Sequence, residues 1–136
     1  MSKKYRNYLM KYSPGNHGMM NWNEEDLSIY MHDLIGNRLS LSIGLYDGDQ
    51  LIGIALGRIK HWYNGREFWI DEFGIMTDEQ SKGLGTQFMD LVVDYTKKRG
   101  IDRIMLITER EFPAYYFYQK NGFEEQSSQV VFMKQY

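Results

Sequence analysis

A strand–helix–strand unit lies in the second half of the chain, where residues 68–108 read FWIDEFGIMTDEQSKGLGTQFMDLVVDYTKKRGIDRIMLIT. Residues 68–76 and 101–108 are typical of strands, and the loop after the first of them contains Gly83 and Gly85. Between the strands, apolar residues recur at helical spacing and predict one buried face, made of Leu84, Phe88, Leu91, Val92 and Tyr95. A crossover of this length predicts two parallel strands joined in the right-handed sense.

Shorter connections precede this unit. Residues 39–45 alternate apolar with smaller or polar side chains, as a half-buried strand does, and a turn follows at 47–49. Residues 51–62 predict a second strand, and Asn64-Gly65 predicts a hairpin turn of the primed type before the third strand at 68–76. Strands joined by such tight turns are antiparallel.

Helices are expected on either side of the strands. Residues 3–12 predict a short helix, and Asn23, followed by three carboxylates, predicts the start of another that ends at Gly36. The apolar stripe of that second helix is Leu27, Tyr30, Met31 and Leu34. Pro113 predicts a helix that stops at Asn121-Gly122, with a last strand pair at 123–126 and 130–135. Together these elements predict an α/β fold with a mixed sheet in a single domain spanning residues 1–136.

The composition narrows the class of protein. The 136 residues are 43% hydrophobic and 25% charged, a balance typical of one globular domain. A formal charge of −2 argues against a nucleic-acid partner, and the absence of cysteine excludes disulfides, thiolate metal sites and a cysteine nucleophile. The polar N-terminus does not resemble a signal peptide, and no run approaches the roughly 20 apolar residues of a membrane span. We therefore expect a cytoplasmic protein without a membrane partner.

The loop Gln80-Ser81-Lys82-Gly83-Leu84-Gly85 has a specific physical use at the start of a helix. Glycines let a phosphate approach the backbone, and the N–H groups that open a helix point toward it. The spacing is not that of a P-loop, and Phe88 stands where a dinucleotide fingerprint needs a small residue. A simple tight turn rich in glycine is the alternative interpretation.

Two linked segments carry a family resemblance. Glu72-Phe73-Gly74-Ile75-Met76 precedes Gln80-x-x-Gly83-x-Gly85, and Ala114-x-x-Phe117-Tyr118-x-Lys120-x-Gly122-Phe123 follows downstream. In this order and separation they resemble the GCN5-related N-acetyltransferases, the GNAT superfamily, over roughly residues 39–136. The resemblance implies a mostly antiparallel mixed sheet flanked by helices, with parallel central strands joined by a crossover helix.

The resemblance also implies acetyl-CoA as the cosubstrate. The loop from Gln80 to Thr86 would hold the pyrophosphate through its main-chain amides, and the strand end would pair with the pantetheine arm. The implied cofactor-binding residues are Ile75, Met76, Thr77, Gln80, Ser81, Lys82, Gly83, Leu84, Gly85 and Thr86.

Two catalytic roles are implied by position. Tyr118 matches the general acid that protonates the leaving thiolate, although its aromatic neighbours leave a core role open. Glu72 matches a carboxylate that takes a proton from the incoming ammonium. A solvent-facing Glu72, or one paired with Arg66 or Arg103, is the alternative, and Glu109 or water is then the base. Strict strand alternation predicts that Asp71 points to the face opposite Glu72.

The chain also departs from the family. Glu111 stands where many members have an asparagine. The sequence pattern begins with the first helix, so the first strand of the family is expected to be missing. A bare sheet edge, the partner subunit of a homodimer and a trimmed chain remain open as explanations. His17, His32 and His61 lack metal-ligand spacing, so we expect no metal.

The resulting functional hypothesis is an N-acetyltransferase that moves acetyl from acetyl-CoA to a primary amine of a small molecule or peptide. Without cysteine, direct attack in a ternary complex is favoured over a thiol-linked intermediate. An acyl-CoA-binding sensor module without catalysis is the first alternative, and another phosphate- or nucleotide-binding α/β domain is the second.

Overall fold

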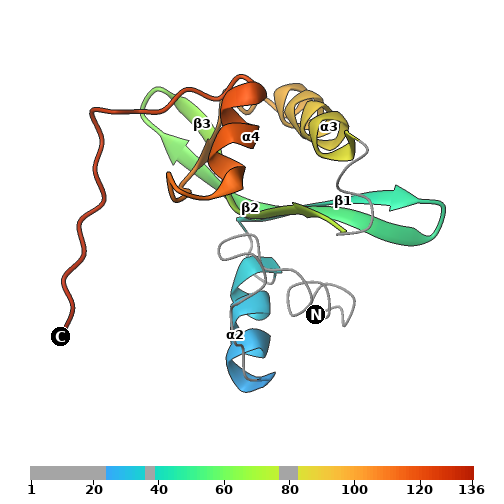
Figure 1. Cartoon of the computed structure of the whole chain (residues 1–136), viewed down its shortest axis with the longest axis horizontal. Coiled ribbons are helices and arrows are strands. Elements are labelled where there is room, and N and C mark those ends of the chain that lie inside the picture. The colour runs from blue at the N-terminus through green and yellow to red at the C-terminus, as the bar shows by residue number, and fades with distance from the viewer. Residues whose placement is uncertain (1–23, 36–38, 77–82) are drawn as a thin grey trace.

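A four-stranded mixed sheet organises the computed structural model, which describes residues 24–35, 39–76 and 83–136. The strand order is β1-β2-β3-β4, where the bounds are Ser40–Asp47, Gln50–Trp62, Gly65–Ile75 and Arg103–Leu106. The first three strands pair antiparallel, and β3 pairs parallel with β4 (Figure 1). The mixed sheet with one parallel pair confirms the predicted fold class.

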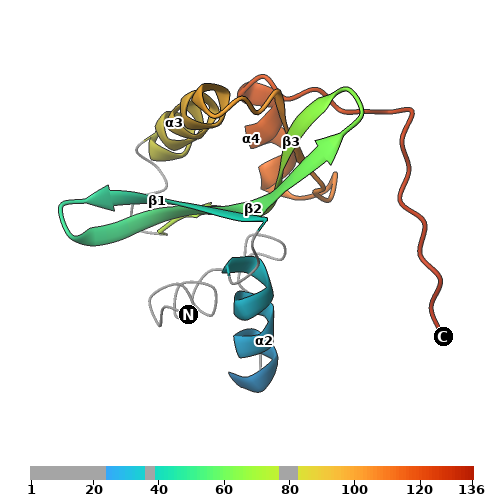
Figure 2. The same ribbon diagram turned by 180° about the vertical axis from the view of Figure 1, so that it is seen from behind.

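Helices cover both faces of the sheet. α3 (Leu84–Lys98) and α4 (Pro113–Lys120) lie on one face, whereas α2 (Glu24–Ile35) lies on the other, where it contacts β1 and β2 (Figures 1 and 2). The helices predicted after Asn23, around the crossover and after Pro113 are thus all present. The expected helix at 3–12, the question of a strand before α2, and the side chains of Leu27, Met31 and Leu34 lie outside what the structure describes.

The core lies between the sheet and α3. Its buried members include Phe68, Ile70, Phe73 and Ile75 of β3 with Phe88, Met89 and Val92 of α3. The ring of Phe73 stacks on that of Phe88 at 5.3 Å between centroids and on that of Phe117 at 5.7 Å. Since burying one such side chain contributes about 1.5–3 kcal/mol, this layer is the main source of stability.

The buried face of α3 differs from the predicted stripe. Leu91 and Tyr95 are 56% and 37% exposed, whereas Met89 and Thr96 are buried. The face is centred on Phe88 and Val92, so Leu91 falls at its margin. Thr96 replaces an apolar residue there because its hydroxyl donates to the carbonyl of Val92 at 2.9 Å, which satisfies the polar group inside the helix.

A β-bulge interrupts the pairing of β2 with β3. Leu56 lies opposite Glu72, but the next residue, Gly57, lies opposite Ile70, so Asp71 is the extra residue. The inward positions on β3 consequently run from Ile70 directly to Phe73. The strict alternation assumed for Asp71 and Glu72 does not hold here, because both lie between two core-facing residues and outside the core.

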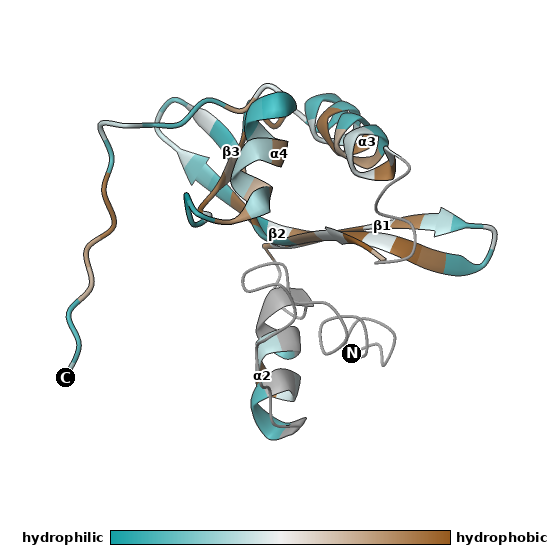
Figure 3. Ribbon diagram, viewed as in Figure 1, coloured by the Kyte–Doolittle hydropathy of each residue, from teal (hydrophilic) through white to brown (hydrophobic). Residues whose placement is uncertain are grey.

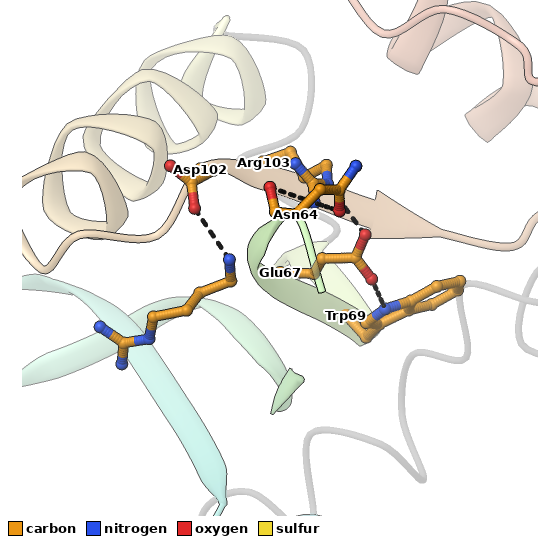
Figure 4. Close-up of polar contacts among 6 residues, drawn as sticks. Asn64, Glu67, Trp69, Asp102 and Arg103 are labelled. Carbon is orange, nitrogen blue, oxygen red and sulfur yellow. Dashed lines mark hydrogen bonds and ion pairs between the residues drawn. The ribbon is translucent and has the colours of Figure 1, made fainter. Parts of the chain in front are cut away.

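Polar contacts join the β2–β3 hairpin to β4 (Figure 4). The carboxylate of Glu67, buried at 7% exposure, accepts from Arg103 Nε and from Trp69 Nε1, both at 2.8 Å. Arg103 also donates to the Asn64 side chain. The hairpin connection is Tyr63-Asn64, one residue earlier than predicted, since Gly65 already pairs with Trp62.

The strand prediction for the C-terminal residues is wrong. Neither 123–126 nor 130–135 forms a strand, and β4 spans Arg103–Leu106 rather than 101–108. The last residues run away from the body as an extended segment (Figure 1). Val130 to Met133 have high β propensity, but propensity alone forms no strand where no neighbouring strand supplies hydrogen bonds.

The close approach of β2 and β3 at the bulge predicts that position 57 has no room for a side chain. A Cβ there would meet the carbonyl oxygen of Trp69 and approach Phe68 Cε1 to 2.8 Å. We therefore expect Gly57→Ala to lower the free energy of unfolding by about 3 kcal/mol, the upper range for overpacking. Denaturant unfolding provides the measurement.

Gly48→Ala serves as the matched control. Gly48 has a φ of 59° with nothing within 4 Å of the added carbon, so only backbone strain of about 1 kcal/mol is expected. Equal losses for the two variants would contradict the close backbone approach at the bulge.

Candidate active site

The parallel pairing of β3 with β4 ends near the candidate site, because β4 ends at Leu106. β4 pairs with β3 only from Glu67 to Ile70, while β3 continues to Ile75. On its other side, β3 remains paired with β2 to its end, and the Met76 N–H donates to the Ile52 carbonyl at 2.9 Å. In the part described, the segment from Asp71 to Ile75 therefore has a strand ladder on one side only. A strand edge of this kind can pair with an extended ligand.

The start of α3 has a geometry that suits an anion. Gly83 occupies the N-cap in the left-handed conformation, at a φ of 72°, and a Cβ there would meet nothing within 4 Å. The first helical hydrogen bond runs from Gln87 N to the Gly83 carbonyl, so the N–H groups of Leu84, Gly85 and Thr86 precede it. No side chain among the described residues caps this helix, and its first turn has no acidic residue. The positive end of the dipole thus suits a phosphate.

The second glycine has a packing role that the sequence did not indicate. A Cβ on Gly85 would lie 3.0 Å from Cε1 of Phe117, so the missing side chain makes room for α4 rather than for a ligand. Thr77, Gln80, Ser81 and Lys82, the other predicted loop residues, lie outside the described residues.

Glu72 lies on the α2 side of the sheet. Its Oε1 accepts a hydrogen bond of 2.7 Å from the hydroxyl of Tyr30, whereas Oε2 is buried and has no partner in the described structure. The carboxyl is mostly buried, and its pKa is raised from 4.5 to about 7. Desolvation is the main cause; the hydrogen bond from Tyr30 opposes it, and the nearby charge of Asp71 adds a smaller increase. Glu72 is therefore a carboxyl poised to exchange a proton near neutral pH.

Tyr30 was missed as a site residue. The sequence placed it in the apolar stripe of its helix, and only the fold brings it to Glu72, 42 positions away. Burial and the Glu72 charge raise the pKa of the Tyr30 hydroxyl far above its usual value, so this group stays protonated and donates.

The arginine partners considered for Glu72 are engaged elsewhere. Arg103 pairs with Glu67 at 2.8 Å, and Arg66 Nη1 donates to the Arg99 carbonyl at 2.8 Å. Asp71, the neighbour of Glu72, pairs with Arg58 at 3.4 Å. The alternative interpretation of Glu72 as an ion-pair partner of Arg66 or Arg103 is therefore wrong.

Tyr118 lies on the opposite face, in α4. Its ring packs edge-on against Phe73, Phe117 and Phe123, with centroids 6.5, 5.4 and 5.4 Å away. The ring thus contributes to the core whatever its hydroxyl does. Glu72 and Tyr118 lie on different faces of the sheet, and β3, which continues past the end of β4, runs between them.

The other candidates lie apart from this arrangement. Glu109, the alternative base, is exposed beyond β4, and His61 is exposed at the end of β2. Across residues 24–35, 39–76 and 83–136, no group of three or more metal-ligating side chains occurs. None of the described helices is long and apolar enough to cross a membrane.

Comparison with known proteins gives one family. The model of the Acetyltransferase (GNAT) family matches residues 4–123. No curated protein matches the chain.

Solved structures share the fold at low identity. AAC(6')-Iy in complex with the bisubstrate analog CoA-S-monomethyl-acetylneamine has a TM-score of 0.73 and 18% identity, over 98% of this chain and 90% of that one. A ribosomal-protein-alanine N-acetyltransferase from Brucella melitensis biovar Abortus 2308 has a TM-score of 0.73 and 16% identity, over 97% and 91%. The aminoglycoside 6'-N-acetyltransferase AAC(6')-Ih from Acinetobacter baumannii has a TM-score of 0.69 and 17% identity, over 98% and 90%.

The raised pKa of Glu72 predicts a specific pH dependence of stability. Between pH 4.5 and about 7, the unfolded carboxyl is ionised while the folded one stays protonated, so the folded state loses stability as pH rises. A difference of this size corresponds to about 3 kcal/mol. We expect the free energy of unfolding of Glu72→Gln, relative to wild type, to rise by this amount across the interval.

Urea unfolding of both proteins at several pH values checks this. Contributions of other groups, such as Glu67, whose ion pair with Arg103 lowers its pKa, are common to both proteins and cancel. Curves that stay parallel from pH 4.5 to 8 would show that Glu72 ionises at its ordinary pKa.

Proposed function

Because this chain belongs to the acetyltransferase (GNAT) family, we propose that it transfers the acetyl group of acetyl-CoA to a primary amine of a small molecule or peptide. The observation that best supports this is Glu72, a buried carboxyl with a pKa of about 7 beside the point where β3 leaves β4. An amine must lose a proton before it attacks a thioester, and a base with this pKa is suited to that step at neutral pH.

The cosubstrate would bind along the end of β3 and the start of α3. The N–H groups of Leu84, Gly85 and Thr86 suit the pyrophosphate, and the open space at Gly83 admits it. Gln80, Ser81 and Lys82 would complete this loop, as the family resemblance implies. The pantetheine arm would lie along β3 toward Ile75, Met76 and Thr77. This position directs the thioester toward the segment that carries Glu72.

The reaction then needs one base and one acid. The amine nitrogen attacks the thioester carbonyl carbon, the C–N bond forms, and the C–S bond breaks. Glu72 takes the proton from the ammonium through Oε2, since Oε1 already accepts from Tyr30. Tyr118 gives its proton to the departing thiolate from the other face of the sheet. Glu109 or water remains the alternative base.

The acceptor side corresponds to the face covered by α2. Glu72 opens to that face, where Glu25 and Asp26 are exposed carboxylates of the same helix as Tyr30. A cationic small-molecule amine is the substrate class that such charges attract; the alternative is that they stabilise the start of the helix on a solvated face. Among the similar structures, AAC(6')-Iy is in complex with a CoA-S-monomethyl-acetylneamine analog, and AAC(6')-Ih is an aminoglycoside 6'-N-acetyltransferase. A third is a ribosomal-protein-alanine N-acetyltransferase.

The first prediction for this proposal concerns the base. We expect release of free CoA thiol from acetyl-CoA in the presence of accepted amines, and a kcat lower by about 10²–10⁴-fold in Glu72→Gln. Affinity for CoA, measured by calorimetry, should stay unchanged in that variant.

Tyr30→Phe removes the hydrogen bond that lowers the Glu72 pKa, so the acidic limb of kcat/KM should move to higher pH by about one unit or more. Tyr116→Phe, at a residue 65% exposed, is the matched control.

The outcomes separate the rival functions. CoA binding without turnover against any amine would replace the proposal with a silent acyl-CoA-binding module. Displacement by ATP with no affinity for CoA would favour a nucleotide-binding domain. A normal rate in Glu72→Gln from pH 6 to 9 would move the base to Glu109 or water.

A second prediction concerns Tyr118. Tyr118→Phe retains the ring that packs against Phe73 and removes only the proton donor. We expect a lower kcat with the KM for acetyl-CoA within a few-fold, because the donor acts mainly in the transition state. The effect should shrink with an activated thioester whose thiolate leaves unaided. A variant that loses thermal stability but keeps its turnover per folded molecule would leave Tyr118 as a core aromatic only.

A further inference from the structure

The buried carboxylate of Glu67 is a titratable group that the proposed reaction does not use. It accepts from Arg103 Nε and from Trp69 Nε1, both at 2.8 Å, and Arg103 also donates to Asn64 (Figure 4). The hydrogen bond from Arg103 holds the pKa of this carboxyl below its usual range, so the group is ionised at neutral pH. Charge-assisted hydrogen bonds fix geometry as well as adding energy. The side chain whose orientation they fix is the indole of Trp69.

The Trp69 ring lies on the face of the sheet that carries Glu72. Its neighbours on β3, Phe68 and Ile70, both belong to the core, so strand alternation turns Trp69 to the other face. The residue is half-buried, and it is the last outward position before the bulge that turns Glu72 to the same face. Three positions of a strand span about 10 Å. A fixed indole therefore lies beside the carboxyl proposed as the base.

An apolar side chain of β4 continues this surface. Met105 lies opposite Trp69 in the parallel register, two positions after Arg103, and is also half-buried. The tip of the hairpin between β2 and β3 is hydrophilic, whereas the sheet becomes hydrophobic beneath α3 (Figure 3). An oriented indole beside a thioether, within a polar part of the sheet, suits the flat side of a ring.

A cation already lies beside the indole. Lys60 Nζ is 5.8 Å from the centroid of the Trp69 ring and 4.3 Å from that of the exposed Trp62. An ammonium that a ligand brought to Trp69 would be repelled by Lys60, whereas an uncharged ring would not. The charges on this face therefore suit an acceptor whose reacting amine is its one cationic centre.

We propose that Trp69 binds the body of the acceptor, and that the acceptor is a primary amine that carries a ring and no second cationic group. The ring stacks on the indole and contacts Met105 while the amine reaches Glu72. Lys60 disfavours acceptors with a second ammonium. The inference rests on the proposed acetyl transfer and names its substrate class. Aromatic rings and sugar rings share this chemistry, and the experiment distinguishes them.

Trp69→Leu tests the stacking, because it removes the ring and retains an apolar side chain. We expect the KM for phenethylamine or for glucosamine to rise about 10-fold, and the KM for hexylamine, which has no ring, to stay within about 2-fold. A rise for one of the two ring amines identifies the ring as aromatic or sugar. Tyr63→Leu, at a hairpin residue 88% exposed, is the control and should change none of these values. An unchanged KM for both ring amines would overturn the proposal.

Glu67 acts through Trp69 and is a positioning residue. Glu67→Gln keeps an oxygen for the indole N–H but removes the charge that holds Arg103. The KM for the ring amine affected by Trp69→Leu should rise, whereas kcat and the KM values for hexylamine and acetyl-CoA should stay unchanged. An equal loss with every amine would mean that Glu67 serves the fold alone.

Lys60→Gln tests the exclusion of a second cation. We expect the native KM to be higher for para-xylylenediamine than for phenethylamine, and the variant to lower the diamine value about 3-fold without changing the other, since one like charge about 6 Å away in water has an effect of this size. Lys97→Gln removes the same charge from α3, on the opposite face, and should change neither value. Equal native KM values for the two amines would overturn the exclusion.

Tryptophan fluorescence gives a readout that does not depend on turnover. In Trp22→Phe/Trp62→Phe, Trp69 is the one tryptophan left of three. With CoA present, at least one of the two ring amines should change its emission saturably, and hexylamine should not. If no amine is acetylated, such a response retains the binding site and contradicts the proposed transfer alone. No response to either ring amine would overturn the site, and this arm also decides the matter should Trp69→Leu fail to fold.

Discussion

The extra residue in β3 determines to which face of the sheet Glu72 points. With unbroken alternation after Ile70, Glu72 would face the core in place of Phe73, and its carboxylate would be buried beside Phe88 and Phe117. The bulge opposite Leu56 and Gly57 shifts the phase of the strand by one. Phe73 and Ile75 then continue the core, and Glu72 turns to the α2 face, where Tyr30 meets it. Bulges commonly re-aim a side chain beside a functional site, and here the shift supplies both the packing and the titratable group.

The pKa and the hydrogen bonding of Glu72 follow from its incomplete burial. Glu72 is buried enough for desolvation to raise its pKa, and one oxygen is held by Tyr30. The other oxygen has no partner among the described residues, which is a costly arrangement that a stable fold retains where a ligand or proton is to be received. The start of α3 has a related character, because no side chain among the described residues caps it and the positive end of the helix dipole lies there.

Much of the fold could be predicted from the sequence, and the predictions that were wrong or missing share one cause. The crossover unit, the helix after Asn23 and the helix opened by Pro113 were predicted correctly because local periodicity and capping residues determine them. The bulge was not predicted, because it depends on the close approach of the Trp69 backbone to Gly57, and no local sequence pattern indicates that contact. The contact of Tyr30 with Glu72 joins residues far apart in sequence, and Tyr30 resembled an ordinary core residue. The strand expected at 130–135 failed because strand formation depends on a neighbour that the described chain does not place beside it. The roles of Glu72 and Tyr118 remain predictions from the family resemblance.

The parallel pairing of β3 with β4 also has a kinetic consequence. β1, β2 and β3 are joined by two-residue hairpin connections, so their contacts are local and close early. The contact between Glu67 and Arg103, by contrast, joins residues 36 positions apart and must await the whole crossover. Closing a loop of this length carries an entropic cost before any contact repays it. We expect the antiparallel meander to assemble first and β4 to dock last, held by the contacts of Arg103 and Trp69 with the buried carboxylate of Glu67. The end of the pairing between β3 and β4 would then be the last part of the sheet to form and the first to open.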